Sequence, residues 1–69
     1  MPNAAELKTM AIADILQKYP QTQPIFQRFG LQAYAHTETA RYENLEASAL
    51  VHSVDLQALV SALTKTIEG

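Results

Sequence analysis

The sequence of 69 residues predicts an all-α protein, a compact bundle of four to five short helices that forms one helical domain over residues 1–69. Apolar residues recur at the three- and four-residue spacing of a helix face, and helix start and stop residues separate the segments that carry them. No segment alternates apolar and polar residues in the manner of a half-buried strand. These observations together favour helices throughout.

The first predicted helix begins at about Ala4 and ends before Pro20. Asn3, followed three positions later by Glu6, is a variant of the capping box that satisfies free amides at a helix start. The helix ends before Pro20 because a proline disfavours helical backbone angles in the residue before it. The pattern also allows a break over residues 9–11.

A second, short helix is predicted between Thr22 and Gly30. Thr22 is the expected cap, and Pro24 lies in the first turn, where its missing amide hydrogen costs nothing. Gly30 lies just past the end, so Leu31 is expected to fold back onto the helix as the apolar contact typical of this ending.

Two further helices are predicted after residue 43, divided at residues 53–55. Asn44 and Asp55 are the expected caps. The last helix has the clearest period in the chain, formed by Leu56, Leu59, Val60, Leu63 and Ile67. Residues 30–43, by contrast, show no helical or strand period and are predicted to be a loop.

The composition narrows the classes of partner. Five Lys and Arg against seven Asp and Glu give a net charge of −2 without a basic stripe, so no nucleic-acid partner is expected. No apolar run approaches the roughly 20 residues that span a bilayer, and the first residues lack the apolar stretch of a signal peptide, so we expect a cytoplasmic protein without membrane contact.

The chain contains no cysteine, which excludes disulfides, zinc-thiolate sites and iron-sulfur ligation by its own side chains. A domain this small buries only about 60% of the surface of its unfolded chain, so its core is marginal. Small domains often gain the missing stability from a cofactor or from a partner subunit. A bound ligand and a homodimer are therefore both compatible with the sequence.

Most of the side chains that could bind a metal or a cofactor lie in the predicted loop. His36 is either a solvated side chain or a ligand for a metal or haem iron. Tyr34 and Tyr42 either complete the core or wall a flat ligand, with Arg41 as the cation for its carboxylates. His52 is a second candidate ligand, although its place at a helix C-terminus also suits a structural imidazole.

The sequence gives little support for catalysis. It contains no glycine-rich phosphate loop and no nucleophile elbow, and a histidine near an acidic residue occurs by chance in chains of this composition. The two histidines are also too far apart in sequence to form the i, i+4 zinc pair of a single helix. We therefore predict a protein that is not an enzyme.

Two stretches, "MAIADILQKYPQTQPIFQRFGL" and "YENLEASALVHSVDLQALVSAL", resemble a known family. They are similar to the small helical hybrid-cluster-protein-associated disulfide domains, a domain of unknown function related to the N-terminal domain of iron-cluster repair proteins. The resemblance covers most of the chain, from about Met10 to Leu63. The shared residues are mostly packing and capping residues, so the resemblance implies the fold more strongly than an activity.

The departures from the family pattern bear on function. Ala33 and His36 stand where the family has its C-x-x-C cysteines, so thiol–disulfide chemistry is lost. Ser53 replaces a helix-ending glycine and Ala11 a capping threonine. The resemblance to cysteine-poor cyanobacterial relatives that bind haem b through histidine implies a non-catalytic module for haem b or a related iron cofactor. His36 would be one iron ligand, with His52 as the second or with a ligand from a partner subunit.

A competing hypothesis is an interaction module without a cofactor, in which the helical domain docks another protein. The sequence favours it because no second iron ligand is unambiguous.

Overall fold

The computed structural model of the chain describes residues 3–69 and confirms the all-α prediction. Over this range the chain forms six α-helices and two 3₁₀ helices, with one isolated antiparallel bridge and no longer strand pairing. Their order is α1 (Ala4–Thr9), α2 (Ile12–Lys18), η1 (Pro20–Thr22), α3 (Gln23–Arg28), α4 (Gln32–Ala35), η2 (Glu38–Arg41), α5 (Leu45–Val51) and α6 (Leu56–Glu68). The number of helices is therefore higher than the four to five expected.

One reason is that the first predicted helix is broken at Met10 and Ala11, as the pattern allowed. Asn3 caps α1 as expected, because its side-chain oxygen accepts a hydrogen bond from the Glu6 amide at 2.8 Å. At the break, the Met10 carbonyl accepts a hydrogen bond of 2.8 Å from the Leu45 amide. The break thus fixes the start of α5 against the joint between α1 and α2.

The glycine-terminated end of α3 is confirmed. Gly30 has a φ of +77°, and the Leu31 amide donates to the Phe26 carbonyl at 2.8 Å, which is the bond pattern of a Schellman ending. The expected cap at Thr22 is wrong in detail. Thr22 stands at the cap position, but its hydroxyl donates backward to the Tyr19 carbonyl at 2.7 Å and so closes η1.

The prediction of a structureless loop over residues 30–43 is also wrong, because α4 and η2 both lie within it. Each is a single turn of four residues. A turn this short has too few positions to show an amphipathic period, so the sequence pattern could not reveal it. The Ala35 amide closes the first turn by donating to the Leu31 carbonyl at 2.8 Å.

Both caps of the last two helices are confirmed. The Asn44 side chain accepts from the Ala47 amide at 2.8 Å, and the Asp55 side chain accepts from the Ala58 amide at 3.1 Å. Between these helices, Ser53 has a φ of 56°, the left-handed region that glycine usually fills. The expected helix ending therefore forms with serine in place of glycine.

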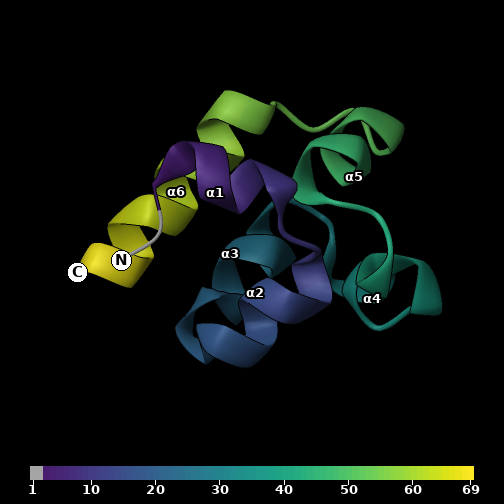
Figure 1. Cartoon of the computed structure of the whole chain (residues 1–69), viewed down its shortest axis with the longest axis horizontal. Helices are drawn as coiled ribbons and strands as arrows, with labels where there is room; N and C mark the ends of the chain where they lie inside the picture. The colour runs from purple at the N-terminus through teal and green to yellow at the C-terminus, as the bar shows by residue number, and fades with distance from the viewer. Residues whose placement is uncertain (1–2) are drawn as a thin grey trace.

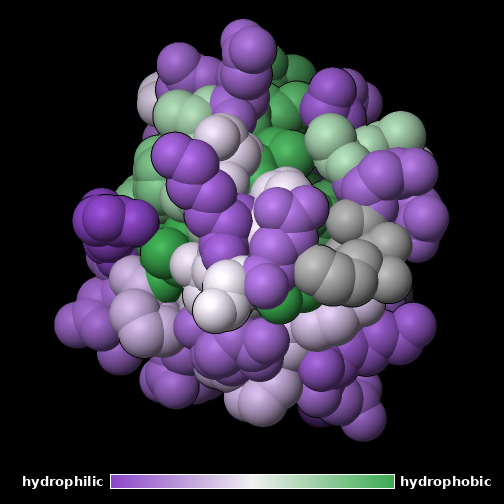
Figure 2. Space-filling view, turned by 90° about the vertical axis from the view of Figure 1, so that its left-hand side faces the viewer, coloured by the Kyte–Doolittle hydropathy of each residue, from purple (hydrophilic) through white to green (hydrophobic). Residues whose placement is uncertain are grey.

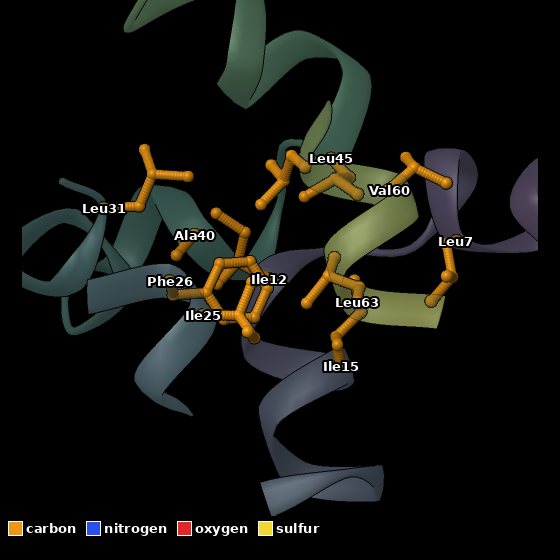
Figure 3. Close-up of a cluster of buried hydrophobic side chains, with 11 residues drawn as sticks. Leu7, Ile12, Ile15, Ile25, Phe26, Leu31, Ala40, Leu45, Val60 and Leu63 are labelled. Carbon is orange, nitrogen blue, oxygen red and sulfur yellow. The ribbon is translucent and has the colours of Figure 1, made fainter. Parts of the chain in front are cut away.

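The core is formed by side chains from the whole described chain (Figure 3). Its buried members are Leu7, Ile12, Ile15, Ile25, Phe26, Leu31, Ala40, Leu45, Leu59, Val60 and Leu63. Figure 1 shows the start of α1 and the end of α6 at one side of the molecule and α4 at the opposite side. No helix within residues 3–69 is long and apolar enough to cross a membrane.

Candidate functional site

An open groove lies beside His36, between α2, η1, α3 and α4. The groove has a volume of about 210 Å³ and is lined by Leu16, Pro20, Gln23, Phe26, Gln32, Ala35 and His36. An adjoining hollow of about 430 Å³ shares Leu16, Ala35 and His36 and extends to Arg41. We call the two together the His36 groove. Most of the surface that lines it is apolar.

The backbone of α4 sets the place of His36. His36 follows the last residue of α4, and its amide donates to the Ala33 carbonyl at 3.3 Å. Its imidazole is exposed. It lines the same hollow as Arg41, the last residue of η2. The two short turns that the sequence did not predict therefore bring together one histidine and one arginine.

Tyr34 belongs to a different cluster. Its hydroxyl donates a hydrogen bond to the Glu43 carboxylate at 2.5 Å and accepts one from the Ser48 hydroxyl at 3.1 Å. Its ring lies against the His52 ring, with ring centres 4.4 Å apart and planes tilted by 60°. Tyr34 and His36 are two residues apart, so the helical turn directs them to opposite sides of α4. We call Tyr34, Glu43, Ser48 and His52 the Tyr34 cluster.

The pKa of the Tyr34 phenol is raised above its usual value. Partial burial is the main cause, and the hydrogen bond to Glu43 and the negative charge of that carboxylate act in the same direction. The Ser48 hydroxyl, which donates to the phenol oxygen, lowers the pKa by a smaller amount. The phenol is therefore held in its protonated, hydrogen-bond-donating form.

The structure separates the two histidines. His52 follows the last residue of α5 and contacts Tyr34, whereas His36 lies on the groove. Among residues 3–69, the side chains that line the His36 groove include neither His52 nor Tyr34 nor Tyr42. The same range holds no group of three His, Asp or Glu side chains that could bind a metal ion.

Tyr42 lies on the surface, with 78% of its area exposed. Leu50 and Val51, at the end of α5, are also exposed, at 82% and 62%. Side chains this large and apolar are usually more buried. Tyr42 therefore lies on the outer surface and does not line the His36 groove.

Sequence reasoning missed several residues that shape both sites. Leu16 and Phe26 line the His36 groove, although their positions on apolar helix faces indicate only that they pack in the core. Glu43 and Ser48, which bind the Tyr34 hydroxyl, carried no local signal, because the contacts join residues 9 and 14 positions apart in sequence. Only the fold brings such residues together.

Residues 8–60 match the sequence model of a family described as a domain of unknown function, DUF1858. The matched range begins in α1, ends in α6 and contains both the His36 groove and the Tyr34 cluster. No curated protein and no solved structure matches the chain.

Proposed function

The chain belongs to the DUF1858 family of domains of unknown function, as its resemblance predicted, and from this premise we propose that it is a small, non-catalytic binding module for haem b or a related iron cofactor. The proposed site is the His36 groove, and His36 is the proposed iron ligand. The observation that supports it best is the position of an exposed imidazole on the edge of an apolar groove.

The residues of the groove fit a flat apolar ligand that carries carboxylates. Leu16, Pro20 and Ala35 offer exposed or half-buried apolar surface, and the imidazole of His36 offers a nitrogen that coordinates iron when it is neutral. Arg41, at the end of the adjoining hollow, would pair with a propionate carboxylate. Bound haem would supply a redox-active iron, and the chain would hold and orient it.

One chain would cover only part of such a ligand. The His36 groove is open to solvent, whereas small-molecule sites usually bury most of the ligand's surface. His52 packs on Tyr34 and does not line the groove, so it is poorly placed to serve as a second ligand in the same chain. We therefore infer that a second copy of the chain closes the groove and donates the second ligand, which makes the haem-bound form a homodimer.

A haemin titration of the purified full chain tests this proposal. The expected result is a Soret band shifted from that of free haemin, one haem per two chains, and a dimer by sedimentation only when haem is present. His36→Ala is expected to abolish the shifted band, because its removal takes away the iron ligand. A band identical to that of free haemin, or one that His36→Ala leaves unchanged, would rule the proposal out.

His52→Ala is the matched control. It removes the other imidazole of the chain without touching the groove lining. We expect it to keep the shifted Soret band. Loss of the band in this variant alone would assign the iron ligand to the Tyr34 cluster and contradict the site proposed here.

The second candidate function is a cofactor-free interaction module. The exposure of Leu50 and Val51, at 82% and 62%, favours it, because these two apolar side chains are neighbours at the end of α5 and contiguous exposed apolar surface is typical of contact sites. The haemin titration separates the two candidates, since an interaction module gives no Soret shift. Leu50→Lys and Val51→Lys would then weaken partner binding and leave the fold intact.

A further inference from the structure

A second groove runs between α1 and α6. It has a volume of about 570 Å³ and is open to solvent. Among residues 3–69, its lining shares no side chain with the His36 groove. Figure 2 looks onto the side of the molecule where α1 starts and α6 ends and shows small hydrophobic areas between hydrophilic side chains.

The floor of this groove is apolar. Leu56 and Val60 lie one helical turn apart on α6, and Ala4 contributes from α1. Leu59 and Leu63, one position to the side of this stripe, are fully buried in the core. Val60 is itself a core residue with 5% of its area exposed, whereas Leu56 is half-buried and Ala4 is exposed, so Leu56 and Ala4 supply the open apolar surface of the groove.

The charged groups of the groove are all cationic. Lys8 on α1 and Lys65 on α6 both line it, and the lining within residues 3–69 includes no carboxylate. This contrasts with the chain as a whole, which has five Lys and Arg, seven Asp and Glu and a net charge of −2. A cationic groove on an acidic protein attracts an acidic ligand locally, while the rest of the surface repels it.

The shape of the groove favours a helix over a fatty acid. Sites for small apolar ligands usually enclose most of the ligand, whereas this groove is open. Its lining on α6 runs from Leu56 to Lys65, which corresponds to about 14 Å of helix axis. On α1 the lining runs only from Ala4 to Lys8, so α6 is the longer wall, and its length suits the apolar face of a short amphipathic helix.

We propose that the α1–α6 groove binds an acidic amphipathic helix of another protein, with Ala4 and Leu56 contacting its apolar side chains and Lys8 and Lys65 pairing with its carboxylates. The proposal is independent of haem binding, because the two grooves use different side chains.

The test uses the full chain labelled with ¹⁵N and a synthetic helical peptide of about 15 residues, with leucine on one face and glutamate beside it. A peptide with lysine in place of every glutamate and sodium oleate are the two other probes. We expect the acidic peptide to shift the amide signals of α1 and α6, with affinity that falls as salt is added. The basic peptide and oleate are expected to leave these signals unchanged.

Charge reversal then locates the contact. The double variant Lys8→Glu, Lys65→Glu is expected to weaken the acidic peptide by about tenfold or more, whereas Lys18→Glu, an exposed lysine on α2 outside this groove, is expected to have no effect. Lys18 and Lys65 are exposed and Lys8 is half-buried, outside the core, so all variants should fold. Shifts elsewhere, equal binding of the basic peptide, binding of oleate alone, or an unchanged affinity in the double variant would overturn the proposal.

Discussion

Tyr34 donates a hydrogen bond to Glu43, and this contact closes the segment between α3 and α5. Tyr34 lies on α4 and Glu43 just before α5, with η2 between them. The same hydroxyl accepts a hydrogen bond from Ser48, which is fully buried on α5. One phenol oxygen therefore joins both ends of the segment that carries His36 and Arg41.

We predict that Tyr34→Phe lowers the free energy of unfolding by about 1–2 kcal/mol, because it leaves Glu43 and the buried Ser48 without their shared partner. Urea denaturation monitored by circular dichroism measures the change. Tyr42→Phe is the matched control, since it removes the hydroxyl of a tyrosine that is 78% exposed and should change stability by less than about 0.5 kcal/mol. Equal effects in the two variants would show that the Tyr34 contacts contribute nothing.

The raised pKa of Tyr34 predicts a loss of stability at alkaline pH. The folded state keeps the phenol proton at a pH where the unfolded chain has lost it, so the folded state binds more protons. This contribution is complete below the unfolded pKa of about 10 and declines as pH rises through the folded value. The stability difference between the unmodified chain and Tyr34→Phe should thus be constant up to about pH 9 and then shrink. A difference that stays constant through about pH 11 would contradict this prediction.

The sequence predicted the helix ends better than the site. Asn44, Asp55 and Gly30 act as expected because a cap depends on residues within four or five positions, which the sequence displays directly. Thr22 shows the limit of this reasoning. Its hydroxyl could either accept a hydrogen bond from an amide in the first turn of α3 or donate one to the Tyr19 carbonyl, and the 3₁₀ turn of η1 decided for the second.

The candidate site was predicted only in part because its geometry depends on the unpredicted turns. With residues 30–43 treated as a loop, Tyr34, His36 and Arg41 were free to face one ligand together. The turn of α4 instead directs Tyr34 toward α5 and leaves His36 and Arg41 on the groove. No local pattern separates these outcomes, since the partners of Tyr34 lie in or beside α5, at least nine positions away in sequence.

We predict that Ser53→Gly stabilises the fold by about 1 kcal/mol, because Ser53 occupies the left-handed region at a φ of 56°, where a residue with a Cβ atom is strained and glycine is not. Thermal unfolding measures the gain. Ser61→Gly is the control, as the same substitution on the exposed side of α6 should instead destabilise by roughly 0.5 kcal/mol. A loss of stability in both variants would mean that the strain at Ser53 is negligible.

The last prediction concerns the start of α2. Ala11 stands at its cap position with extended backbone angles of φ −72° and ψ 150°, yet it offers no side-chain acceptor to the first turn. We expect Ala11→Ser to stabilise the chain by about 0.5–1 kcal/mol, because the serine hydroxyl can accept a bond from the amide of Asp14. Asn44→Ala, which removes an existing cap bond of 2.8 Å at α5, should cost about 1 kcal/mol. Urea midpoints that move in opposite directions would support this account. A drop in both would mean that Ala11, which is only 7% exposed, lacks room for the added oxygen, and that packing at the α1–α2 break outweighs the cap.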